Sequence, residues 1–173
     1  MKSRSILIDI QVDKLTNSIE NAITGDSFPT CILPLTKVDL KGIAKKNGWK
    51  FDWKGELLYP DRDVFKLTIV NNTEIIQGLI SVSITADNVY IHLIENAPFN
   101  IGRNKVYLGV AGNLIAYACK LSFQNGKEGF VSFRAKTVLI KHYVEKIGAI
   151  HFGGHLLILD TKASLHLLNK YNP

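Results

Sequence analysis

Three apolar runs joined by short polar turns constrain the fold of this chain more than any other feature. The runs DVFKLTIV, IIQGLISVSI and VYIHLIE occupy residues 63–70, 75–84 and 89–95. Asn71-Asn72 and Asp87-Asn88 stand between them, and both residue types tolerate the backbone conformations of tight turns. Strand-like runs joined by such turns predict an antiparallel three-stranded meander.

The segments on either side of the meander show helical spacing, glycine stops or further apolar runs. After the meander we expect a helix from near Gly112, a strand over 129–135, a helix over 137–147 closed by Gly148, a hairpin over 150–160 and a helix over 163–171. Before it we expect a strand over 4–12, a helix over 13–24, an extended segment over 28–35, a short lysine-rich helix over 37–46 and a loop or irregular strand over 49–61.

The order of these elements predicts the topology of the sheet. A strand, a crossover helix and a second strand place GFVSFRA, residues 129–135, parallel to VYIHLIE. The expected fold class is α+β, with a mostly antiparallel central sheet, one parallel pair and flanking helices. This arrangement puts the turn before the Gly112 helix at the carboxyl end of a central strand, where open sheets of this kind bind ligands.

Composition places few limits on function. The 173 residues fit one domain, 1–173, and the net charge of +6 suits an anionic ligand or nucleic acid without requiring either. Two cysteines, Cys31 and Cys119, are too few for a disulfide framework and favour small buried side chains in a reducing compartment. We expect a cytoplasmic protein, a monomer or a homodimer, with no membrane partner.

The stretch YLGVAGNL, residues 107–114, carries the clearest binding signal. Gly109, Ala111 and Gly112 keep side chains away from a helix start, where free N–H groups and the helix dipole favour a pyrophosphate. The pattern is neither a P-loop nor the dinucleotide-binding fingerprint. On this motif alone, a turn that binds nothing is an equal alternative.

With the order of elements, GVAGNL resembles the GNAT superfamily of acyl-CoA-dependent N-acetyltransferases. It stands where that family has its pyrophosphate loop, Gly-x-Gly/Ala followed by a helix with an early Leu, here Leu114. HYVEKIGA resembles the later family helix, in which a Tyr precedes a Gly. The resemblance covers residues 63–152 well and the first sixty weakly, and ENAPFN with AKTVLIKHY is similar to a bacterial branch of GNAT-like proteins.

The resemblance implies direct transfer of an acetyl group from acetyl-CoA to a primary amine, with coenzyme A as co-substrate and no metal. Val106 stands where the family usually has Gln or Arg, so Arg103 and Lys105 are expected to supply the positive charge. The implied cofactor-binding residues are Leu93, Ile94, Arg103, Lys105, Gly109, Val110, Ala111, Gly112, Asn113 and Leu114.

Two side chains are candidates for proton transfer. Glu95 ends the central strand and could take a proton from the amine, although a solvent-facing or turn-capping carboxylate is an equal alternative. The resemblance assigns Tyr143 as the acid for the leaving thiolate, and a packing tyrosine with a surface hydroxyl is the alternative. His92 is expected to point to the face opposite Glu95, as a covered histidine and only a reserve base.

The segment KVDLKGIAKKNGWKFDWK, residues 37–54, leaves further readings open. It carries six lysines together with Trp49, Phe51 and Trp53, a combination that can bind single-stranded nucleic acid. A solvated lysine helix with its tryptophans packed on the sheet is the favoured interpretation. The alternative functions are acetylation of aminoacyl-tRNA, as in toxin-like GNAT proteins, and a coenzyme A-binding module without catalysis.

Overall fold

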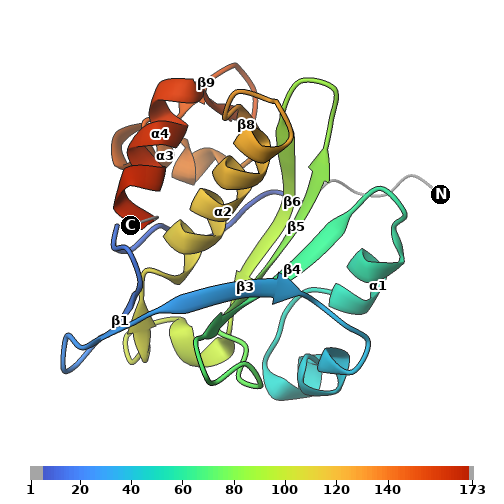
Figure 1. The fold of residues 1–173 in the computed structure, drawn as a ribbon, viewed down its shortest axis with the longest axis vertical. Helices are drawn as coiled ribbons and strands as arrows, with labels where there is room; N and C mark the ends of the chain where they lie inside the picture. Colours follow the sequence, from blue (N-terminus) through green and yellow to red (C-terminus); the bar gives the residue numbers. More distant parts are fainter. Residues whose placement is uncertain (1–5, 172–173) are drawn as a thin grey trace.

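A mixed sheet dominates the computed structural model, which describes residues 6–171. Within these residues seven strands lie in the order β3-β4-β5-β6-β8-β10-β9 (Figure 1). The strands are β3 (Thr30–Pro34), β4 (Asp63–Ile69), β5 (Gly78–Ile84), β6 (Val89–Asn96), β8 (Val131–Arg134), β9 (Ile150–His151) and β10 (Leu156–Leu159). The α-helices are α1 (Trp53–Leu58), α2 (Val110–Gln124), α3 (Thr137–Ile147) and α4 (Thr161–Tyr171).

The predicted meander and the parallel crossover are both confirmed. Strands β4, β5 and β6 pair antiparallel in sequence order, and β6 pairs parallel with β8. The helix between them, α2, begins close to the expected position and packs on β5, β6 and α4. The expected α+β fold class, mostly antiparallel with one parallel pair and flanking helices, is therefore the observed one.

A β-bulge in β6 separates this strand from β8. On β5, Ser81 pairs with Leu93 but Val82 pairs with Ile91, so His92 has no partner across the ladder. The β6–β8 ladder ends at the Ile91–Phe133 pair, immediately before the bulge. Since a bulge bends and twists its strand, the last residues of β6 diverge from β8 and leave a gap at the carboxyl end of the sheet.

Residues 6–14, which we call the N-terminal strap, run into this gap. Ile8 forms a parallel bridge with Ala135, donates its N–H to the Arg134 carbonyl at 2.8 Å and accepts one from Lys136 at 3.0 Å. Ile8 and Val12 are 2% and 1% exposed and belong to the main core. In Figure 1 the strap is the dark blue segment that passes behind α2. The strand predicted over 4–12 is thus an extended segment with a single bridge, and residues 4 and 5 lie outside the described part.

The predicted helix over 13–24 is wrong. That segment contains β1 (Ile19–Asn21), which pairs antiparallel with β2 (Ser27–Phe28) and with β7 (Tyr107–Leu108) in a separate three-stranded sheet. The pairing with β7 joins residues almost ninety positions apart, and such a contact overrides local helical spacing. It also brings residues 13–20 to the start of α2.

The segment over 37–61 also differs from expectation. Its lysine-rich part forms two short 3₁₀ turns, Asp39–Gly42 and Lys45–Asn47, rather than one helix. The part expected to be irregular contains α1, whose N-cap Asp52 accepts a hydrogen bond from the Gly55 N–H. The sequence signal for α1 was Asp52, a residue type that commonly caps the start of a helix.

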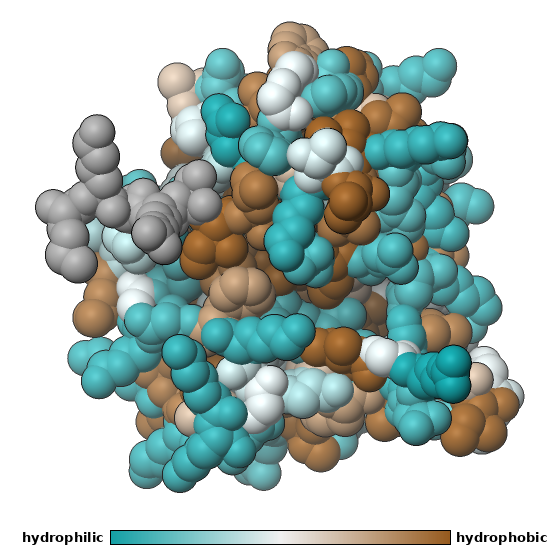
Figure 2. All heavy atoms as spheres, turned by 180° about the vertical axis from the view of Figure 1, so that it is seen from behind, coloured by the Kyte–Doolittle hydropathy of each residue, from teal (hydrophilic) through white to brown (hydrophobic). Residues whose placement is uncertain are grey.

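Apolar side chains pack in two clusters. The larger joins α2, α3 and α4 to the sheet, and the smaller packs 3₁₀ and α1 residues against β4, β5 and β6. On the face behind that of Figure 1, hydrophobic side chains are interspersed with hydrophilic ones (Figure 2). Isolated exposed hydrophobic residues such as Ile23, which is 96% exposed, are ordinary on a folded domain.

Candidate functional site

The start of α2 depends on Gly109. This residue precedes the helix with φ +93°, in the left-handed region that favours glycine. A Cβ here would lie 2.5 Å from Cγ2 of Thr16 and 3.1 Å from the Ser18 carbonyl oxygen. The glycine therefore allows residues 13–18, which we call the covering loop, to lie directly on the helix start.

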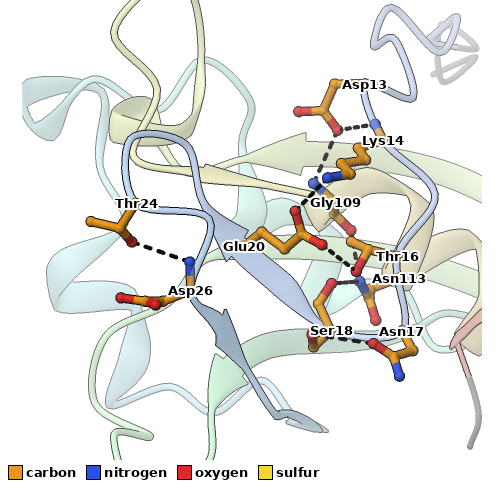
Figure 3. A network of polar contacts seen from close by, with 10 residues as sticks. All are labelled: Asp13, Lys14, Thr16, Asn17, Ser18, Glu20, Thr24, Asp26, Gly109 and Asn113. Atoms are coloured by element: carbon orange, nitrogen blue, oxygen red, sulfur yellow. Dashed lines mark hydrogen bonds and ion pairs between the residues drawn. The ribbon is translucent and has the colours of Figure 1, made fainter.

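The carboxylate of Asp13 occupies this helix start. Its Oδ1 accepts the Gly109 N–H at 3.0 Å (Figure 3). Its Oδ2 lies 3.1 Å from Nζ of Lys105. Free N–H groups and the positive end of the helix dipole favour an anion at this position. The structure thus shows an anion-binding arrangement, in which the anion is a side chain from 96 positions earlier in the chain.

The rest of the predicted pyrophosphate loop is buried, and Val110 and Leu114 lie against Gly78 of β5. Val110, Ala111 and Leu114 are at most 1% exposed. Asn113 donates from Nδ2 to the carbonyls of Ser18 and Gly109, which ties the covering loop to the helix. Within residues 6–171 no acceptor contacts the N–H groups of residues 110–112. Arg103 is exposed and makes no contact with this arrangement.

A pocket of about 240 Å³ lies beside the covered helix start. One wall is the strap, another is the end of β6, and Lys105 lines both the pocket and the Asp13 site. Oδ1 of Asn96 is buried and has no hydrogen-bond partner among the described residues. Since a buried carbonyl oxygen normally has a donor, a ligand with an N–H or O–H group would complete this wall. The lining residues are Asp9, Ile10, Gln11, Lys50, Phe51, Ile94, Glu95, Asn96, Asn100, Ile101, Gly102 and Lys105.

Glu95 lies in the pocket wall and is already strongly hydrogen-bonded. It accepts the Lys50 N–H at 2.7 Å, the Phe51 N–H at 3.3 Å and the Trp53 indole N–H at 2.8 Å. The residue is 4% exposed. The carboxylate therefore anchors the segment before α1, and any proton transfer would require it to exchange one of these bonds.

His92 shares a face of the sheet with Glu95, so the expectation of opposite faces is wrong. The bulge at His92 shifts the alternation, and Ile91 and Ile94 consequently both belong to the main core. His92 Nε2 lies 2.6 Å from Oγ of Ser83. Burial lowers the pKa of His92, and the positive charge of Arg62 lowers it further. The expectation of a covered histidine is thus confirmed.

Tyr143 is fully buried, and its side chain reaches neither the pocket nor the surface. Its ring packs edge-on against Phe133 with centroids 5.1 Å apart, and its hydroxyl donates to the Ile10 carbonyl of the strap. Burial raises the pKa of this hydroxyl, and the nearby Asp9 carboxylate raises it further. A reach of Tyr143 toward a bound thiol would require the hydroxyl to leave Ile10.

The neighbouring His142 also holds the strap. Its Nε2 accepts the Val12 N–H at 2.9 Å, which requires the neutral imidazole. The roles of His142 and Asp13 at the site were not predicted from the sequence. No local pattern could have indicated them, because both act on contacts about a hundred residues away in the chain.

In the segment over 37–54 the tryptophans pack as the favoured interpretation expected, although the lysines are not on one helix. Trp49 and Trp53 are 6% and 1% exposed and belong to the smaller core, while all six lysines are exposed. The two buried indoles cannot stack on bases, which leaves the half-buried Phe51 as the aromatic residue of the nucleic-acid pattern that still reaches a pocket.

Cysteines, metals and membrane spans can be addressed for the described residues. Cys119 is buried, which raises the pKa of its thiol to about 12, and Cys31 is half-buried beside Thr68. Over residues 6–171, no cluster of three or more His, Cys, Asp or Glu side chains could hold a metal ion. No helix in that range is both long and apolar enough to cross a bilayer.

Similar folds occur among solved acetyltransferases. No family model and no curated protein sequence matches the chain. The spermidine N-acetyltransferase from Vibrio cholerae in complex with CoA and spermine aligns with a TM-score of 0.54 and 15% identity, over 79% of this chain and 98% of that one. Mutant forms of the Vibrio cholerae spermidine/spermine N-acetyltransferase SpeG align with the same TM-score and 14% identity, over 79% and 96%. The predicted GNAT acetyltransferase fold is therefore confirmed.

Proposed function

We propose that this protein is an acyl-CoA-dependent N-acyltransferase that transfers an acetyl group to a primary amine. The observation that carries the proposal is the anion site at the start of α2, where the Gly109 N–H and Lys105 already bind a carboxylate. The fold and the pocket between the strap and the end of β6 support the same function. Coenzyme A would supply the acyl group as a thioester.

The residues around the helix start and the pocket fit such a co-substrate. The N–H groups of residues 109–112 at the helix start and the Lys105 ammonium suit a pyrophosphate. The Asn96 Oδ1, which has no partner among the described residues, suits an amide N–H. Ile94 lines the same pocket and provides apolar surface near it, whereas Leu93 is 1% exposed and packs in the smaller core. Arg103, exposed and nearby in sequence, is available for the outer phosphates.

Two side chains would move protons during the transfer. The amine nitrogen bonds to the carbonyl carbon, the carbon–sulfur bond breaks, and the departing thiolate takes the proton of the Tyr143 hydroxyl. The hydroxyl holds its proton at neutral pH, but its raised pKa makes it a weaker acid, so it would have to leave its buried position near Asp9 to protonate the thiolate efficiently. Glu95 would receive the amine proton directly or through water, after exchanging one of its present hydrogen bonds.

Calorimetric titration with acetyl-CoA tests the binding half of the proposal. We expect saturable binding by the full chain and its loss in Gly112→Asp, which places a carboxylate beside the phosphates. Circular dichroism of the variant would verify that it is folded. If the parent shows no binding at millimolar acetyl-CoA, the proposed function is wrong.

Turnover of Tyr143→Phe tests the catalytic half. Removal of the hydroxyl should lower the rate of acetyl transfer by roughly a hundredfold, the usual contribution of a general acid. Tyr117→Phe removes a hydroxyl from a half-buried tyrosine on α2 and serves as the matched control. Equal rates for the two variants would exclude Tyr143 as the acid.

A second candidate is a coenzyme A-binding module without catalysis. The hydrogen bond that holds the Tyr143 hydroxyl on the strap favours it, since a committed donor cannot serve a thiolate. Acetyl-CoA turnover by the parent with a broad panel of primary amines, polyamines included, distinguishes the candidates. Any amine-dependent release of coenzyme A excludes the module.

A further inference from the structure

Asp13 takes two donors that the proposed function assigns to phosphate groups. One is the Gly109 N–H at the helix start, and the other is the Lys105 ammonium, which also lines the neighbouring pocket. The Asp13 side chain is only 18% exposed. A pyrophosphate and this carboxylate therefore cannot occupy the donors at the same time.

We propose that Asp13 is an internal competitor of coenzyme A, and that cofactor binding requires the covering loop, residues 13–18, to release the start of α2. The inference rests on the proposed function, since it names the group that the cofactor must displace. In the closed state shown here, the protein's own carboxylate neutralises the anion site.

The contacts of the covering loop define what must break. Besides Asp13, the loop is held by Asn113, which donates to the Ser18 carbonyl at 3.2 Å. The loop also makes two side-chain bonds to Glu20, which accepts from Lys14 and from Thr16 (Figure 3). Because Glu20 lies in β1, which pairs with β7, these two bonds tie the loop to the small sheet, and release of the loop must break them as well as the Asp13 and Asn113 contacts.

We expect the covering loop to leave the start of α2 while the strap upstream of Asp13 stays in place. Ile8 and Val12 are core residues, and freeing them would expose two apolar side chains to water. Asp13 instead lies at the edge of the core, where its carboxylate can pass from protein donors to water. The strap upstream of Asp13 then remains as one wall of the pocket.

The affinity of Asp13→Asn for coenzyme A tests this inference. The variant keeps a side-chain oxygen for the Gly109 N–H but loses the charge, so the fold should persist while the competitor weakens. Asp26→Asn is the matched control, because Asp26 is an exposed aspartate between β1 and β2 that does not line the pocket. Asp13→Ala, which removes the acceptor as well, is a second variant.

We expect calorimetry to give about tenfold tighter coenzyme A binding for Asp13→Asn than for the parent, because a neutral acceptor competes less well than a charged one. Asp13→Ala should gain at least as much, and Asp26→Asn should stay within about twofold of the parent. If the parent binds coenzyme A and neither Asp13 variant binds it more tightly, the competition is refuted while the proposed function stands. An equal gain in Asp26→Asn would also refute it, because the gain would then follow from the net charge of the protein and not from the helix start. Absence of binding in the parent and all variants would overturn the proposed function and this inference together.

Discussion

The covered start of α2 and the pocket beside Glu95 are the two parts of the proposed cofactor site, and they differ in what fills them. At the helix start the protein supplies its own anion, Asp13, and the covering loop lies directly on Gly109. At the pocket the wall retains an unpartnered buried oxygen on Asn96 and a cavity of about 240 Å³. Lys105 contributes to both parts.

The difference shows that the shape of a binding site and its accessibility have separate origins. The shape of the helix start follows from elements close in sequence, the glycine turn and α2, whereas the pocket also takes walls from the strap and from Lys50 and Phe51. The covering comes from a segment almost a hundred residues earlier. A mutation at the covered helix start should therefore leave the pocket largely intact, and a mutation in the pocket should leave the helix start largely intact. Both expectations can be tested.

Gly109→Ala should give the largest effect, because it attacks the covered helix start directly. The substitution forces an alanine into φ +93° and brings its Cβ within 2.5 Å of Thr16. Strain and overlap together should lower the free energy of unfolding by about 3 kcal/mol. Gly25→Ala is the control, since Gly25 has φ +77° but no atom within 4 Å of the added Cβ. Urea denaturation of both variants measures the difference, and equal losses would mean that the covering loop does not press on Gly109.

Glu95→Gln should give an intermediate effect at the pocket. The amide cannot accept all three hydrogen bonds that the carboxylate accepts, and the site is buried. We expect a loss of about 2 kcal/mol in the free energy of unfolding. Glu74→Gln, at an exposed position, should be neutral. Stability equal to that of the parent would show that Glu95 is not the anchor described here and would favour a role in proton transfer alone.

Titration of His142 should give the smallest effect and sharpen the role of the strap. Burial lowers its pKa from 6.5, Lys146 lowers it further, and Glu145 partly offsets both. The unfolded state therefore takes up the proton first as the pH falls below about 6.5, so stability should decrease on acidification. Protonation also removes the acceptor for the Val12 N–H. His142→Gln should flatten the pH dependence of the unfolding midpoint between pH 7 and 5, whereas His151→Gln should not. If both variants keep the parent slope, the His142 contact does not stabilise the fold.

The sequence predicted the elements whose signals are local. The meander, the helix after Gly109, the crossover and the C-terminal hairpin have regular spacing and turn residues that agree with the structure. The strand β1 was mistaken for helix because its pairing with β7 is distant, and the bulge at His92 is invisible to simple alternation. For the site, Gly109 and Lys105 could be identified as anion donors. Asp13, which accepts from both, could not be identified, because the residues around it in the sequence carry no signal of a contact with a helix start 96 positions later.

Amide hydrogen exchange with and without saturating coenzyme A tests the central claim most directly. The account predicts slower exchange in residues 109–114, where the cofactor binds, and faster exchange in residues 13–18, as the covering loop leaves the helix start. Exchange at Ile8 should remain unchanged, because the strap stays in the core. Slower exchange in both segments would contradict the account, since the cofactor would then bind with the covering loop still closed over α2.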